Sequence, residues 1–233
     1  ADQQLSLRDK KFDKYYIFSA AKGEIRNGLL KGTDISEPFA NGVIAFKSHG
    51  DDIIFYVTYD GAKESQAKLI VLTDQKNKFN LRPINKDPNN AYLLNLAKFD
   101  GNWYYVAGAP SSDLVRIYKN PLSRVKDNST AQASPQVSMR ISSPQFTSFS
   151  ENTRFIAVQS GKQFVVYDAE DGRMYRYEMQ LAIAASQQAK WMDGHRLTVN
   201  SDGRVFVFDF DGTNVQNLVA SAPDFGSYFD KDY

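Results

Sequence analysis

A short hairpin pattern recurs at near-regular intervals along the chain, and this recurrence constrains the fold more than any other feature. In each copy an apolar run is joined to a second apolar or aromatic run across a turn that contains Gly, Asn or Asp. The copies cover residues 44–57, 96–106, 147–158 and 190–199, with a fifth beginning at 228–231. Equivalent turn positions are Gly50, Gly101, Asn152, Gly194 and Lys231. Subtracting their numbers gives spacings of 51, 51, 42 and 37 residues, near the ~40 to 50 residues of a β-propeller blade.

A second hairpin follows each of the first four copies. Its first strands are expected at 68–72, 114–118, 164–167 and 205–208. Its turns are expected near 75–77, at Asn120-Pro121, at Asp171-Gly172 and at Asp211-Gly212. Asp-Gly is a strong hairpin signal because both central turn residues must tolerate positive φ. Sustained helical periodicity is nearly absent, so helices should be scarce.

Two consecutive hairpins make one four-stranded unit, and the repeats predict a single all-β domain over 1–233. The predicted architecture is a β-propeller of five four-stranded blades. Residues 15–30 form an outer hairpin with no inner partner before it, and 228–231 form an inner strand with no outer partner after it. Pairing the two ends would close the ring and leave no exposed edge. The alternative is a fragment of a six- to eight-bladed ring.

Composition and charge bear on whether the chain binds nucleic acid or enters a membrane. An apolar fraction of 42% is ample for a core. The 28 basic and 27 acidic residues leave a formal charge of +1, so no overall field draws the chain to nucleic acid, and none is expected as a partner. No apolar run approaches the roughly 18 residues that span a bilayer. We expect no membrane insertion by this segment, although an anchor outside it would be compatible with these features.

The segments 190–197 and 201–218 carry a recognisable repeat. An aromatic residue precedes Asp193-Gly194, two apolar strands follow, and Asp211-Gly212-Thr213-Asn214 leads into a short polar-apolar strand. This repeat resembles that of TolB-like or WD40-like bacterial propellers. The resemblance implies an exported, extracytoplasmic protein, periplasmic or at the cell surface, that binds a protein or cell-envelope component, and it transfers no catalytic residue. The N-terminal α/β domain of TolB has no counterpart in this sequence.

Few residues here are suited to metal or covalent chemistry. The chain has no cysteine and two histidines, which excludes disulfides, thiolate sites and the usual metal-hydrolase ligand sets. His49 and His195 fall in hairpin turns of different units. The acidic turn 209–214 has oxygen ligands for calcium but lacks a third ligand before its glycine and a distant glutamate. A plain hairpin turn is therefore favoured, and we predict no metal, no cofactor and no catalytic residue.

Carbohydrate chemistry is the alternative function. Trp103 and Trp191 could stack against sugar rings, and carboxylates on different blades could form a glycosidase pair. No sialidase-type Asp-box, Gly-x-Ser-x-Gly elbow or Gly-rich phosphate loop occurs. Packing between blades is the favoured role for the aromatic residues. We therefore expect a non-enzymatic protein, with a carbohydrate-binding or glycoside-hydrolysing five-bladed propeller as the alternative.

The loops predict where a partner binds. In an up-and-down blade the turns between strands 1 and 2 and between 3 and 4 share one face, and the 2–3 loops and blade connections share the other. The second face should carry the longer loops, among which we place the polar loop 119–143, and such loops on rigid scaffolds commonly bind partners. The sequence thus predicts a binding or assembly scaffold whose contact residues are Tyr59, Asp60, Asp113, Arg124 and Lys126.

Overall fold

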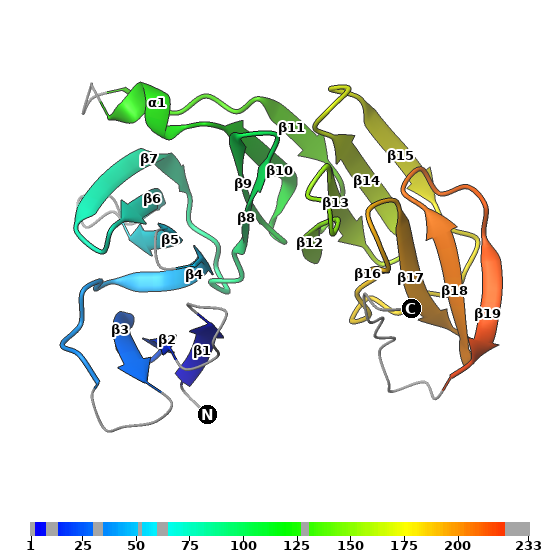
Figure 1. Ribbon diagram of the computed structural model, residues 1–233, viewed down its shortest axis with the longest axis horizontal. Helices are drawn as coiled ribbons and strands as arrows, with labels where there is room; N and C mark the ends of the chain where they lie inside the picture. The colour runs from blue at the N-terminus through cyan, green and yellow to red at the C-terminus, as the bar shows by residue number, and fades with distance from the viewer. Residues whose placement is uncertain are drawn as a thin grey trace.

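The computed structural model describes residues 3–7, 14–29, 35–50, 53–59, 65–126 and 131–221. Within these ranges the chain forms five antiparallel sheets, each built from strands that are consecutive in the sequence. Figure 1 shows the sheets following one another along an arc in chain order, from the N-terminal sheet at the lower left to the C-terminal sheet at the right. The predicted all-β character and the five repeated units are therefore confirmed.

The strands run up and down in chain order within each sheet. Sheet 1 contains β1 (Gln3–Leu7), β2 (Lys14–Ser19) and β3 (Glu24–Leu29). Sheet 2 contains β4 (Val43–His49), β5 (Ile53–Tyr59), β6 (Gln66–Thr73) and β7 (Asn77–Asn85). Sheet 3 contains β8 (Leu93–Phe99), β9 (Asn102–Ala109), β10 (Ser112–Lys119) and β11 (Val137–Arg140). Sheet 4 contains β12 (Phe146–Phe149), β13 (Phe155–Ser160), β14 (Gln163–Asp168) and β15 (Met174–Glu178). Sheet 5 contains β16 (Lys190–Trp191), β17 (Arg196–Ser201), β18 (Arg204–Asp209) and β19 (Gln216–Ala220).

Two strands differ from the sequence prediction. β1 pairs with β2 in sheet 1, whereas the sequence predicted no strand before the hairpin of residues 15–30. β10 does not turn back at Asn120-Pro121; its partner β11 begins only at Val137, after an insertion that contains the helix α1 (Leu122–Val125). The inner strand expected at 228–231 lies outside the described residues, so closure of the ring by the two ends stays a prediction.

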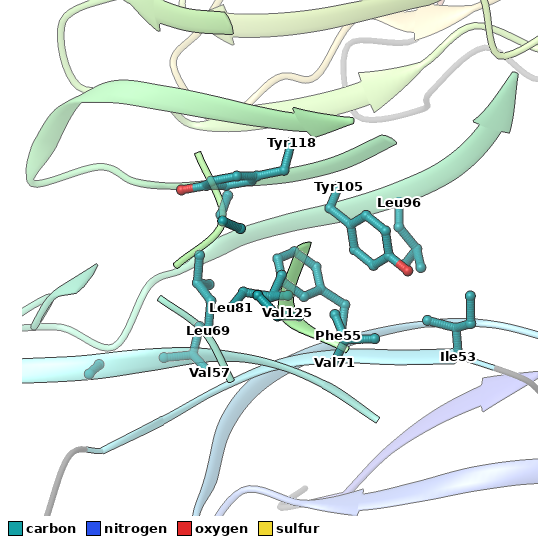
Figure 2. Packing of buried hydrophobic residues seen from close by; sticks show 13 residues of the cluster. Ile53, Phe55, Val57, Leu69, Val71, Leu81, Leu96, Tyr105, Tyr118 and Val125 are labelled. Atoms are coloured by element: carbon teal, nitrogen blue, oxygen red, sulfur yellow. The ribbon is translucent and has the colours of Figure 1, made fainter. Parts of the chain in front are cut away.

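Apolar layers join each sheet to the next. The layer between sheets 2 and 3 includes Phe55, Leu69, Leu81, Tyr105 and Tyr118, all almost wholly buried (Figure 2). Similar layers lie between sheets 1 and 2, 3 and 4, and 4 and 5. Because a middle sheet is covered on both sides, its central strands read as continuous apolar runs, as residues 53–57 of β5 do. Burial of each large side chain contributes about 1.5–3 kcal/mol.

Both tryptophans pack between sheets, as the sequence favoured. Trp103 lies against the layer between sheets 2 and 3. The Trp191 ring stacks on Phe155, with centroids 6.1 Å apart and planes 16° apart. Its indole Nε1 donates a hydrogen bond to the Ser148 hydroxyl at 3.0 Å. Trp191 therefore joins sheet 5 to sheet 4 through both an apolar and a polar contact.

Candidate binding face

The alternating strand directions place the turns and connections on two opposite faces of the protein, one at each end of the strands. The turns 110–111, 161–162 and 202–203 join the second and third strands of sheets 3, 4 and 5, and the connections 86–92 and 141–145 join successive sheets. All of these lie at the same ends of the strands, because each strand reverses the direction of the previous one. We call this side the loop face. The opposite side, which carries turns such as 74–76, 100–101 and 210–215, is called the hairpin face.

The polar insertion after β10 lies on the hairpin face, so its predicted placement among the blade connections was wrong. β10 and β11 are antiparallel partners in one sheet, which makes the insertion a turn between the third and fourth strands. Two apolar residues anchor it, since Val125 and Ala133 are buried in the layer between sheets 2 and 3. The Ala133 amide also donates a hydrogen bond to the Leu81 carbonyl at 2.8 Å.

The five predicted contact residues therefore do not share one surface. Arg124 and Lys126 are exposed on the hairpin face, where Arg124 donates a hydrogen bond to the Ser134 hydroxyl at 3.1 Å and the Lys126 ammonium lies 5.7 Å from the Phe79 ring centroid. Tyr59 and Asp113 lie on the loop face. Asp60 lies outside the described residues.

Tyr59 is presented by the end of β5 and held by the connection 86–92. Its side chain is 43% exposed, and its hydroxyl donates a hydrogen bond to Asn90 Oδ1 at 2.7 Å. The Lys86 ammonium lies 4.7 Å from the centroid of the Tyr59 ring, a cation–π contact. The loop face of sheet 2 thus offers an aromatic ring, a cation and an amide that are fixed relative to one another.

Asp87 organises this connection, and the sequence prediction missed it. The side chain is buried and accepts hydrogen bonds from the Asn89 amide at 3.0 Å, from the Ala91 amide at 2.9 Å and from the Ser111 hydroxyl. The Asp87 amide donates to the Tyr92 hydroxyl at 2.9 Å. Burial by itself would raise the pKa of Asp87, but these hydrogen bonds lower it below the ordinary value. Asp87 therefore fastens the connection 86–92 to the turn 110–111 as a carboxylate.

Asp113 makes a simpler link on the same face. It is exposed at the start of β10, and its carboxylate accepts one hydrogen bond from the Ser143 amide at 3.0 Å. This bond ties the start of β10 to the connection 141–145 that leads into sheet 4. Asp87 and Asp113 thus form a matched pair of loop-face carboxylates, the first buried with three donors and the second exposed with one.

Substitution of these two carboxylates should separate their roles. Asp87→Ala removes a buried carboxylate that accepts three hydrogen bonds, and we expect a loss of about 1–3 kcal/mol in the free energy of unfolding. Asp113→Ala should cost less than about 1 kcal/mol because water can replace its single bond. Urea denaturation of both variants measures the difference. Equal losses would show that Asp87 does not hold the connection.

The histidines and the acidic turn lie apart from this face. The His49 ring, in sheet 2, packs edge-on against Trp103 with centroids 4.9 Å apart, and His195 lies before β17 of sheet 5. In the described part of the chain, no three His, Asp or Glu side chains come together as a metal-binding group. Nor does any described helix have the length and hydrophobicity to cross a membrane.

The turn 209–214 uses its own side chains to close the hairpin. Asp211 Oδ1 accepts hydrogen bonds from the Thr213 amide at 3.1 Å and the Thr213 hydroxyl at 2.6 Å, and Asp209 Oδ2 accepts one from Asn214 at 2.5 Å. Gly212 has a φ of 84°, and a Cβ there would lie 2.5 Å from the Tyr177 ring of sheet 4. The turn residues thus serve the hairpin and its close approach to sheet 4.

Comparisons with known proteins give structural matches alone. No family model and no curated protein matches the sequence. A chain in a crystal structure of the Mitotic Checkpoint Complex matches with a TM-score of 0.59 at 10% identity, over 95% of this chain and 66% of that chain. A Bacteroides fragilis protein described as a candidate 6-phosphogluconolactonase matches with a TM-score of 0.54 at 14% identity, over 91% of this chain and 68% of that one.

A functionally unknown protein from Desulfotomaculum acetoxidans also matches, with a TM-score of 0.53 at 9% identity, over 94% of this chain and 71% of that one. The chain therefore spans about two thirds of the length of these structures. At such identities the likeness shows the fold alone. Together with the five up-and-down sheets, it confirms the predicted class, an all-β protein with a propeller fold.

Proposed function

We propose that this protein is a non-catalytic binding or assembly scaffold that binds a protein partner through the loop face of sheets 2 and 3. The observation that carries this proposal is the fixed group formed by Tyr59, Lys86 and Asn90, held in place by Asp87. Tyrosine is enriched among the residues that dominate binding energy at protein interfaces. Loops on a rigid scaffold are also common positions for binding residues.

Pre-organisation of the loop face supports a binding role. Association costs about 0.5–1.5 kcal/mol for each mobile side chain that becomes fixed. The hydrogen bond and the cation–π contact of Tyr59 already restrict its ring in the unbound protein. The Asp87 hydrogen bonds restrict the connection beneath it. A partner that packs on Tyr59 would therefore lose little conformational entropy in fixing this surface.

The cellular setting is proposed from the sequence. The resemblance of 190–197 and 201–218 to TolB-like repeats supports an exported bacterial protein that acts outside the cytoplasm, with its partner in the cell envelope. The absence of enzymatic activity is proposed on the same basis, because no catalytic residue carries over from that resemblance.

Affinity capture with matched variants tests the proposal. Three baits are compared: the wild type, a loop-face double variant with Tyr59→Ser and Lys86→Ser, and the control variant Arg124→Ser on the hairpin face. If each loop-face residue contributes about 1–2 kcal/mol, recovery of a specific partner should fall at least about tenfold with the double variant. Arg124→Ser should recover the partner as the wild type does. Thermal unfolding of each bait shows that it is folded.

Binding of the identified partner to the purified baits then gives the decisive comparison. The proposal expects a weaker dissociation constant for the loop-face variant alone. Equal affinity of wild type and loop-face variant, or a loss confined to Arg124→Ser, would contradict it.

A further inference from the structure

A pocket lies between sheets 2 and 3, beside the loop face. One wall is the outermost strand of sheet 2, with Arg82 and Ile84 on β7, and the other is the facing side of β10, with Leu114, Arg116 and Tyr118. Its volume is about 160 Å³. Small residues create the space, because Ala107 on β9 pairs with Arg116 and is followed by Gly108 and Ala109.

The pocket concentrates positive charge. Arg82 and Arg116 both line it, and none of the described lining residues is a carboxylate. In the part of the chain that the structure describes, neither guanidinium group takes part in an ion pair. Arg82 Nη1 donates a hydrogen bond to the Ala133 carbonyl at 3.3 Å. Two like charges that share a pocket repel each other, and this repulsion favours an anion between them.

Buried hydrogen-bond donors point to the same kind of ligand. Tyr118 is 1% exposed, and its hydroxyl makes no hydrogen bond of standard geometry among the described residues. The Nε atom of Arg82 is likewise buried without an acceptor. Burial raises the pKa of Tyr118, against the opposing effects of the Arg82 and Arg116 charges and of the Arg82 side chain as a donor near the hydroxyl, so the hydroxyl remains a proton donor at neutral pH. Figure 2 shows this hydroxyl extending from the sheet 3 side of the layer.

A buried donor without an acceptor destabilises the fold, and more so when it is charged. An oxyanion is the acceptor that matches guanidinium groups, because their planar donors bind carboxylate or phosphate oxygens in pairs. Water occupies about 30 Å³ in the liquid, so this pocket has room for an anionic group and a short carbon skeleton. The neighbouring Pro83, Ile84, Leu94 and Leu114 side chains offer the skeleton an apolar wall.

We propose that this pocket binds a small molecule through its oxyanion group, a phosphate or a carboxylate. Arg82 and Arg116 supply the charge, and Tyr118 supplies a neutral donor. The ligand enters beside Tyr92 and Ser112, which line the pocket at the loop-face ends of the strands. This site differs from the Tyr59 surface and does not depend on a protein partner.

Calorimetric titration at constant ionic strength tests the proposal with two probes, inorganic phosphate and acetate. The wild type should bind at least one of them saturably, and the stronger probe identifies the ligand class as phosphate or carboxylate. Arg116→Gln should weaken that binding at least tenfold. Tyr118→Phe should weaken it about threefold with little change in thermal stability, because the hydroxyl makes no hydrogen bond of standard geometry with the described residues. Arg173→Gln, which removes an exposed charge outside the pocket, should bind as the wild type does.

Stability of the ligand-free variants gives a second readout. Without an anion, Arg116→Gln should unfold at the same temperature as the wild type or higher, because it relieves repulsion with Arg82. Saturable binding by the wild type to neither probe would overturn the proposal. Equal affinities for wild type, Arg116→Gln and Arg173→Gln would overturn it as well, since they would show an ion effect unrelated to this pocket.

Discussion

Replacement of Phe55 by alanine should lower the free energy of unfolding by about 3–5 kcal/mol. Phe55 lies at the centre of the layer between sheets 2 and 3 and has no exposed surface. Its ring meets Tyr105 of sheet 3 edge-on, with centroids 5.3 Å apart and planes 84° apart (Figure 2). The substitution therefore removes both apolar burial and an aromatic contact between two sheets.

Urea denaturation followed by intrinsic fluorescence measures this loss. Val219→Ala is the control, because Val219 on β19 is 60% exposed and its truncation should change stability by less than about 0.5 kcal/mol. A loss below about 1 kcal/mol for Phe55→Ala would mean that the layer between sheets 2 and 3 does not hold them together as described.

Arg154→Met should cost about 3–5 kcal/mol, because it leaves the buried Asp168 carboxylate without its cation. Asp168 has no exposed surface. Arg154 Nε donates to its Oδ1 at 2.9 Å and Arg154 Nη2 to its Oδ2 at 2.6 Å. Glu170 also contacts the guanidinium, and Asp171 lies 3.5 Å from it. After the substitution, the donors to Asp168 that remain among the described residues would be the amides of Glu170 and Asp171.

The effect should depend on pH in a defined direction. Burial by itself would raise the pKa of Asp168, but the hydrogen bonds from Arg154 and from the two amides, with the Arg154 charge, hold it below the ordinary value of 3.8. A carboxyl whose folded pKa is lowered stabilises the fold above its unfolded pKa and loses that contribution as pH falls through the folded pKa. The difference between wild type and Arg154→Met should therefore be full at pH 7 and shrink as pH falls below about 3.8.

A surface pair provides the matched control for Arg154. Arg196 and Asp193 are joined at 2.6 Å, with side chains 49% and 32% exposed. Arg196→Met should cost less than about 1 kcal/mol because exposed ion pairs contribute little. Urea denaturation of both variants from pH 7 down to pH 3 makes the comparison. A loss for Arg154→Met that is no greater than for Arg196→Met would contradict the role assigned to the buried pair.

Local turn chemistry explains which parts of the fold the sequence predicted. Asp100 and Gly101 both have positive φ, 45° and 74°, as the Asp-Gly pair between β8 and β9 indicated. β1 was missed because its residues, Gln3–Leu7, have little strand character of their own and are fixed by pairing with β2. β11 was missed because a helical insertion separates it from β10, and pairing across such an insertion leaves no local signal.

The candidate sites also divide into those with a local sequence signal and those formed only by packing between sheets. Asp87 could have been found, because Asp87-Pro88-Asn89-Asn90 is a typical sequence for a turn in which an aspartate accepts amides that follow it. The pocket could not, because Arg82 and Arg116 lie on different sheets and meet only through packing. Arg124 and Lys126 were placed on the wrong face since nothing in the polar insertion marks Val125 and Ala133 as anchors in the core.

Site-specific photocrosslinking tests most directly the claim that the loop face of sheets 2 and 3 carries the partner contact. Tyr59→p-benzoylphenylalanine places the crosslinker on the loop face, and Arg124→p-benzoylphenylalanine places it on the hairpin face. After irradiation in cells of the source organism, position 59 should yield a covalent adduct with one defined protein, and position 124 should not. An adduct from position 124 with none from position 59, or no adduct from either, would contradict the account.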